Sequence, residues 1–121
     1  MVMTTQDVAN RLVELCSKGD FEGAQRELYA DECISIEPYE TPDFAKETKG
    51  LDAILAKGEK WGSMLEASYG MKVSAPLVAT NAFAVTMSMD VKMKGRDRMT
   101  MTELCVYLVK DGKIVSEAFF M

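Results

Sequence analysis

The C-terminal third of the chain shows the clearest alternation of apolar and polar positions. Between residues 83 and 93 every second residue is apolar, namely Phe83, Val85, Met87, Met89, Val91 and Met93. Side chains on a strand point alternately to its two faces, so this pattern predicts a strand with one apolar face. Polar turn residues at 94–97 lead to a second run at 99–109, and Asp111-Gly112 predicts a hairpin into a third strand at 114–121. The pattern indicates a half-buried antiparallel meander.

Apolar residues at helical spacing predict three helices in the first half of the chain. The first helix covers residues 4–18, with Thr4 and Asp7 resembling a capping box and Gly19 following its end. Asp20 is placed to cap a second, short helix. A third helix opens at Gly50, and its apolar face is traced by Leu51, Ile54, Leu55, Gly58 and Trp61.

The remaining segments predict strands and loops. A short strand at residues 33–37 ends at Pro38, and a polar loop follows at 39–49. Residues 63–76 predict a further strand, which Gly70 and Pro76 interrupt, and residues 79–81 form a turn into the meander. The expected order is helix, helix, short strand, helix and four antiparallel strands. We therefore expect a single α+β domain over residues 1–121, with the helices covering the concave face of a curved sheet.

Composition narrows the class of protein. The chain has 121 residues, enough for one hydrophobic core without disulfides or metal, and a net charge of −5. An acidic chain argues against a nucleic-acid or anionic-membrane partner, because phosphate binding needs clustered Lys and Arg. The sequence shows neither a run long enough to span a membrane nor a leader pattern, so we expect a cytoplasmic protein. The three cysteines are expected to be reduced and mostly buried.

Histidine is absent from the sequence, and this removes several kinds of site. Catalytic dyads and triads that use histidine are excluded, as are zinc or iron sites with histidine ligands. Proton transfer near neutral pH must then come from carboxyl, tyrosine, lysine or thiol groups with shifted pKa values. The sequence also has neither of the common glycine-rich phosphate-binding motifs. We expect no metal, nucleotide or other cofactor.

Four segments in order carry a resemblance to a known family. They are Ser17-Lys18-Gly19-Asp20-Phe21-Glu22, the segment from Tyr29 to Pro38, Lys49-Gly50-Leu51-Asp52-Ala53-Ile54, and the segment from Asp111 to Glu117. The chain resembles the nuclear-transport-factor-2-like superfamily and, within it, the SnoaL-like polyketide-cyclase and ketosteroid-isomerase branch. The resemblance covers essentially the whole chain. It implies a cone-shaped, cystatin-like α+β fold with a cavity between sheet and helices, and a dimer formed through the outer face of the sheet.

The resemblance also permits a comparison with the ketosteroid isomerases, which use an aspartate base with a tyrosine and a protonated aspartate. Glu37 falls where the isomerases carry their base. The place of the tyrosine falls on Leu12, and the place of the protonated acid falls on or near Cys105. Two of the three groups are missing, which argues against steroid isomerase chemistry. The fold alone does not imply a function.

Three glutamates are the candidate catalytic residues: Glu37, Glu103 and Glu117. By the resemblance, alternate residues of the run at 99–109 face the cavity, and the last strand adds further inward positions. The expected ligand-binding residues around the glutamates are Trp61, Met87, Met89, Met101, Cys105, Tyr107 and Phe119. Carboxylates gathered in an apolar pocket cannot all stay ionised, so at least one should have a raised pKa.

A plainer interpretation stands beside this one. Each glutamate taken alone can be a solvated surface residue, and the methionines can fill an irregular core. Three hypotheses stay open: a cofactor-independent isomerase, lyase or cyclase acting on a small apolar molecule, a non-catalytic domain that binds a small ligand or a protein, and an accessory protein with a vestigial cavity. A homodimer is expected, since Leu104, Val106 and Leu108 would otherwise leave an apolar patch exposed on the outer face.

Overall fold

A computed structural model describes residues 3–121 of the chain, and Met1 and Val2 lie outside the described part. The elements follow the order α1 (Thr5–Ser17), α2 (Phe21–Leu28), β1 (Tyr29–Ile36), β2 (Glu47–Lys49), α3 (Leu51–Ser63), β3 (Leu65–Val73), β4 (Leu77–Val78), β5 (Ala82–Met93), β6 (Arg98–Lys110) and β7 (Lys113–Phe120). The three helices and the meander that the sequence predicts are all present, and the fold is an α+β cone.

The helix boundaries follow from capping. Thr4 accepts a hydrogen bond from the backbone of Asp7, and the Asp7 side chain accepts one from the backbone of Thr4, so the capping box is formed. The Asp20 side chain caps α2 through the backbone N–H of Gly23. The third helix follows Gly50, whose φ of 92° is easily adopted only by glycine.

The sheet has the strand order β2-β1-β7-β6-β5-β3, with β4 paired to β5. Strands β5, β6 and β7 are consecutive antiparallel neighbours, as expected of a meander. Asp111 and Gly112 have φ values of 52° and 76°, and positive values at both positions suit the tight turn predicted there. Strand β1, however, pairs with β7 in parallel, so the sheet is mixed.

Three boundaries differ from the sequence-based expectation. Strand β1 begins at Tyr29, four residues earlier than predicted, because the chain passes from α2 directly into the sheet. The loop predicted at 39–49 contains β2, which pairs with the end of β1. A two-residue strand, β4, precedes the turn into β5. None of these short or early segments has an alternation long enough to be recognised in the sequence.

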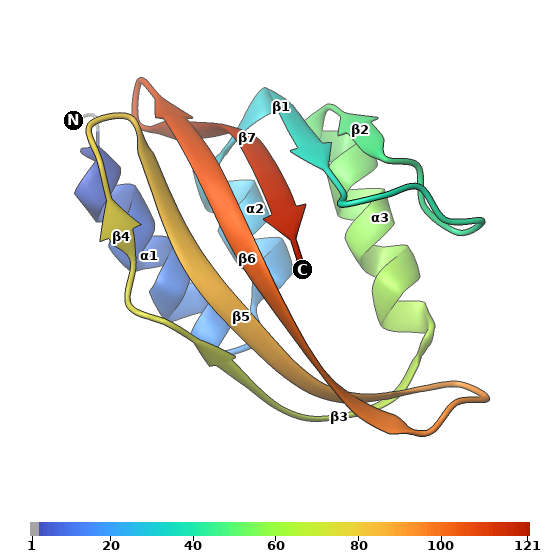
Figure 1. Cartoon of the computed structure of the whole chain (residues 1–121). Helices are drawn as coiled ribbons and strands as arrows, with labels where there is room; N and C mark the ends of the chain where they lie inside the picture. Colours follow the sequence, from blue (N-terminus) through green and yellow to red (C-terminus); the bar gives the residue numbers. More distant parts are fainter. Residues whose placement is uncertain (1–2) are drawn as a thin grey trace.

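The helices enclose one side of the curved sheet (Figure 1). Helices α1 and α2 lie against its concave face, and α3 stands beside β1 and β2 at the open side. The core between α1, α2 and the sheet is built from side chains such as Val8, Leu12, Leu28, Phe83 and Ile114. Among residues 3–121, no helix has the length and apolar character needed to cross a bilayer.

Candidate functional site

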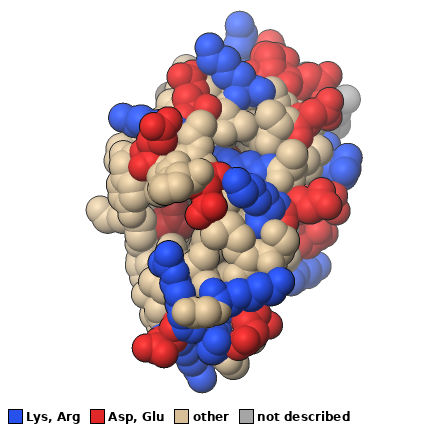
Figure 2. Space-filling model, turned by 90° about the vertical axis from the view of Figure 1, so that its right-hand side faces the viewer, with Lys and Arg blue, Asp and Glu red and all other residues tan. Residues whose placement is uncertain are grey.

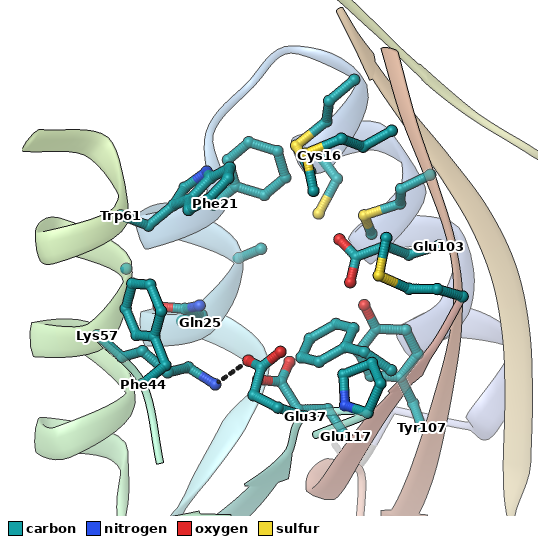
Figure 3. Close-up of a pocket in the computed structure, with 18 of the residues that line it drawn as sticks. Cys16, Phe21, Gln25, Glu37, Phe44, Lys57, Trp61, Glu103, Tyr107 and Glu117 are labelled. Atoms are coloured by element: carbon teal, nitrogen blue, oxygen red, sulfur yellow. Dashed lines mark hydrogen bonds and ion pairs between the residues drawn. The ribbon is translucent and has the colours of Figure 1, made fainter. Parts of the chain in front are cut away.

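A pocket of about 320 Å³ opens between α3, the concave face of the sheet and the loop after β1 (Figure 3). Its wall is mainly aromatic and methionine side chains, with a few polar groups among them. The lining residues include Tyr29, Glu37, Lys57, Trp61, Met87, Met89, Met101, Glu103, Tyr107, Glu117 and Phe119. Pockets that bind small molecules have this composition and a volume of this order.

All but one of the residues selected from the sequence line this pocket. The exception is Cys105, which is fully buried and belongs to the hydrophobic core beneath the pocket. The prediction that Cys105 contacts a ligand is therefore wrong in position. Its side chain lies on the predicted face, between Glu103 and Tyr107, which both line the pocket, but the thiol is the shortest of these three side chains and stays buried. Burial also raises the pKa of the Cys105 thiol, so it stays protonated near neutral pH.

Strand register places Glu117 in a row of four residues that crosses four neighbouring strands. Ser35 on β1 pairs with Glu117 on β7, Glu117 pairs with Tyr107 on β6, and Tyr107 pairs with Phe83 on β5. The rings of Tyr107 and Phe83 are stacked, with centroids 4.8 Å apart. Residues in one row of a sheet face the same side. Glu117 is therefore held on the concave face at the base of the pocket.

Glu117 is only 2% exposed, and each of its carboxyl oxygens has a hydrogen-bond partner. Tyr29 donates its phenol O–H to Oε1, and Ser35 donates its hydroxyl to Oε2 at 2.6 Å. Burial raises the pKa of Glu117, while the hydrogen bonds from Ser35 and Tyr29 and the charge of Lys57 oppose that rise. Together these effects leave the pKa of Glu117 above its ordinary value. Glu117 is thus a buried acid that is fixed in place by two other strand residues.

Glu37 and Lys57 form an ion pair at the pocket wall. Lys57 Nζ lies 2.9 Å from Glu37 Oε1, and the two side chains are 15% and 24% exposed. The same ammonium donates to Ser35 Oγ at 2.6 Å. A continuous chain therefore runs from Glu37 through Lys57 and Ser35 to Glu117. Figure 3 shows Lys57 reaching from α3 toward Glu37 across the lower part of the pocket.

Glu103 occupies the opposite wall and lacks such partners. It lies on β6, paired across the strands with Met87, and its carboxyl group faces the cavity. Within residues 3–121 it forms neither a salt bridge nor a side-chain hydrogen bond. Burial raises the pKa of Glu103, and the negative charges of Glu37 and Glu117 raise it further, with a smaller opposing effect from Lys57. Glu103 therefore differs from Glu37 and Glu117, whose carboxyl groups are held by partners on other elements.

The sequence analysis missed Tyr29, Ser35 and Lys57. Ser35 could have been found from alternation, because it lies two residues before Glu37 on the strand that the sequence predicts at 33–37. Lys57 lies between Ile54 and Trp61 on the apolar face of α3, three residues after the first and four before the second. Tyr29 gave no such signal, since the predicted strand started after it.

The described residues suggest neither a metal site nor a reactive thiol. Between residues 3 and 121, the structure holds no group of three or more acidic or thiol side chains arranged to bind a metal ion. Cys16 lines the pocket, but burial raises its pKa to about 12. A thiol with that pKa is a poor nucleophile at neutral pH. The charged side chains that line the pocket are Glu37, Glu103, Glu117 and Lys57.

Charges on the surface near α3 are mixed in sign. Figure 2 shows acidic and basic side chains interspersed across this face of the molecule. Exposed ion pairs also occur on other parts of the surface, such as Arg26 with Glu22 and Arg98 with Asp90. A face of mixed sign lacks the concentrated positive charge that binds a nucleic-acid backbone.

Comparison with known proteins places the chain in a family. The model of the SnoaL-like domain matches residues 3–121. A crystal structure of a protein from Mesorhizobium loti, provisionally described as a SnoaL-like polyketide cyclase, is 34% identical, with a TM-score of 0.92. The match covers 98% of this chain and 100% of that one. No functionally curated protein matches the chain.

More distant structures share the fold. A protein of unknown function with a cystatin-like fold from Xanthomonas campestris has a TM-score of 0.74 at 20% identity, over 98% of this chain and 90% of its own. An NTF2-like protein of unknown function from Burkholderia pseudomallei has a TM-score of 0.77 at 13% identity, over 98% and 92% of the two chains. At these identities the likeness supports the cone-shaped fold alone.

Proposed function

Because this chain belongs to the SnoaL-like family, we propose that it is a cofactor-independent isomerase, lyase or cyclase that acts on a small apolar molecule by glutamate acid/base chemistry. The Mesorhizobium loti relative, provisionally described as a polyketide cyclase, supports chemistry of this kind. The pocket of this chain must still supply the reacting groups, since the fold hosts more than one activity.

The position of Glu103 is the observation that carries the proposal. Its carboxyl group faces an apolar pocket, has a raised pKa, and is not held by another side chain within residues 3–121. General acid/base catalysis is most effective when the pKa of the catalytic group lies near the working pH. A glutamate with a raised pKa can remove a proton from the carbon next to a carbonyl and can return it to another atom.

Glu37 and Glu117 have supporting roles in this proposal. The carboxyl group of Glu37 is already engaged in an ion pair with Lys57 at 2.9 Å. Glu117 accepts two hydrogen bonds and is nearly inaccessible, so it fixes Tyr29 and Ser35 rather than reaching a ligand. The three glutamates therefore differ in environment, and environment is what separates the roles of carboxyl groups in an active site.

A non-catalytic ligand-binding domain is the alternative, and the pocket wall provides its support. Five methionines line the pocket, namely Met71, Met87, Met89, Met101 and Met121. Methionine side chains are flexible and polarisable, so they adapt to apolar ligands of different shape. In that case Glu103 would serve only to accept a hydrogen bond from the ligand.

An NMR titration of the Glu103 carboxyl group, combined with a hydrogen-exchange screen, separates the two functions. Small apolar ketones in D2O are screened for exchange of the hydrogens next to the carbonyl. We expect Glu103 to titrate above the ordinary range of glutamate, and exchange to be lost in Glu103→Gln. Glu32→Gln, an exposed carboxyl on β1, is the matched control and should retain exchange. A Glu103 titration in the ordinary range, or exchange that survives Glu103→Gln, contradicts the proposal.

A further inference from the structure

Lys57 is the one lysine or arginine among the residues that line the pocket. It projects from α3 on the same face as Ile54 and Trp61, and its side chain is only 15% exposed. A lysine in a largely apolar wall needs compensation for the loss of water around its ammonium group. Glu37 provides part of that compensation, so the position keeps a cation inside the pocket.

The hydrogen bonds of Lys57 account for two of its three N–H groups. One is donated to Ser35 Oγ at 2.6 Å and another to Glu37 Oε1 at 2.9 Å. An ammonium group has three donors and no acceptor. Within residues 3–121 the third N–H has no protein acceptor, and Nζ lies 5.6 Å from the centre of the Phe119 ring, another lining residue. A donor is therefore left for a molecule in the pocket.

The direction of the hydrogen bonds holds this ammonium in place. The hydroxyl of Ser35 donates to Glu117, so its oxygen is free to accept from Lys57. Tyr29 donates to the other oxygen of Glu117. Glu37 and Ser35 thus restrain Lys57 from two sides. A donor restrained before the ligand arrives stabilises developing charge more effectively than one that must reorganise.

We propose that the third N–H of Lys57 binds the carbonyl oxygen of the substrate and stabilises the negative charge that forms on it. This inference rests on the proposed function, and it assigns a role to a residue outside the three glutamates. Glu103, as carboxylate, takes the proton from the adjacent carbon. The C–H electron pair becomes the new carbon–carbon double bond, and the carbonyl π pair moves to the oxygen beside Lys57. Return of the proton from Glu103 to carbon completes the transfer without a change in redox state.

Two ligands of nearly the same shape test the contact: 1-tetralone, a bicyclic ketone, and tetralin, the hydrocarbon without the oxygen. We expect the unmodified protein to bind 1-tetralone roughly tenfold or more tighter than tetralin, because a hydrogen bond to a charged donor is strong. Lys57→Met should abolish that preference. The carbonyl stretching frequency of bound 1-tetralone should be lowered in the unmodified protein and should rise in Lys57→Met.

Lys60→Met is the matched control, because it removes a lysine from the same helix at a position outside the pocket lining. It should keep both the preference and the lowered frequency. Should Lys57→Met fail to fold, the double variant Glu37→Gln/Lys57→Met removes the whole ion pair and gives the same comparison. A preference that survives loss of Lys57, or an unmodified protein that binds neither ligand or both equally, overturns the inference.

Exchange of the hydrogens next to the carbonyl of 1-tetralone distinguishes this inference from the proposed function. Glu103→Gln should abolish exchange and keep the preference for the ketone, whereas Lys57→Met should reduce both. A preference that depends on Lys57 without any exchange would support the contact and contradict the proposed catalysis. Exchange that depends on Glu103 and is unaffected by Lys57→Met would support the catalysis and contradict the contact.

Discussion

The phenol of Tyr29 donates a hydrogen bond to Glu117 inside the core, although 88 residues separate the two in the sequence. Tyr29 is 5% exposed at the start of β1, and Glu117 is 2% exposed on β7. Burial and the neighbouring Glu117 raise the pKa of Tyr29, so its phenol remains protonated and acts as the donor. The contact joins the strand that follows the first two helices to the last strand of the sheet.

Replacing Tyr29 by Phe should destabilise the protein. The variant leaves Oε1 of Glu117 buried without its donor, and a buried group that loses its partner costs about 1–3 kcal/mol. Urea unfolding at pH 7 measures the loss. Tyr69→Phe, at a half-exposed tyrosine, is the control and should stay within about 0.5 kcal/mol. Equal effects of the two substitutions would show that the Tyr29 hydroxyl contributes nothing specific.

Replacing Glu103 by Gln should make the protein more stable at neutral pH. The pKa of Glu103 is raised above the ordinary 4.5 in the folded state, so folding favours its protonated form. The contribution of protonated Glu103 to the stability of the fold is complete below pH 4.5 and is lost as the pH rises through the folded-state pKa of Glu103.

The gain in stability from Glu103→Gln should therefore be absent at pH 4 and should grow as the pH rises above 4.5. Its size at pH 7 is expected to be about 1 kcal/mol or less. Thermal unfolding between pH 4 and 8 checks the prediction. A gain that is the same at every pH, or a loss of stability at pH 7, would contradict it. Activity should fall in the same variant, as expected of an active-site residue whose environment is destabilising.

Replacing Glu37 by Gln should destabilise the protein, because Lys57 would lose its charged partner. The observed pair is partly buried, so its disruption should cost more than that of an exposed pair, about 1–3 kcal/mol. Glu22→Gln breaks an exposed pair with Arg26 and should cost less than about 0.5 kcal/mol. A Glu37→Gln effect no larger than this control would refute the prediction.

The outer face of the sheet leads us to predict a homodimer. Leu104 and Phe120 are cross-strand neighbours there, and Leu104, Leu108 and Phe120 are 43%, 48% and 52% exposed. Apolar side chains gathered on one face mark an interaction surface. Sedimentation velocity at low micromolar concentration should detect a dimer, and Leu104→Lys should shift it to monomer. Thr100→Lys, nearer the solvated end of the meander, should leave the dimer intact. A monomeric unmodified protein would rule out this interface.

The part of the fold that depends on local patterns could be predicted from the sequence. Alternation from Phe83 to Met93 and the Asp111-Gly112 turn define the meander within one stretch of chain. The parallel pairing of β1 with β7 joins residues about eighty positions apart and has no local signal. Register between distant strands is decided by tertiary packing, so no local pattern in the sequence shows that Ser35 reaches Glu117.

The same limit explains the site residues. Alternation places Glu103, Cys105 and Tyr107 on one face of the strand, and the family resemblance predicts that this face is the concave one, but neither shows which of the three side chains reaches the pocket. Cys105 is covered by the core and Glu103 is open to the pocket, although only two positions separate them. Lys57 was overlooked for a different reason. A charged residue in an apolar helical stripe is usually read as solvated, and its buried acceptors come from β1.

The place of β7 in the sheet has a consequence for how the protein is made. This strand is the last of the described elements to leave the ribosome, yet it lies between β1 and β6 and carries both Glu117 and Phe119. Until it is synthesised, β1 lacks its parallel partner, the meander lacks its third strand, and the base of the pocket does not exist. Assembly of the sheet therefore waits for β7: a ribosome stalled before residue 113 holds a chain with exposed strand edges, which chaperones recognise, and without the base of the pocket.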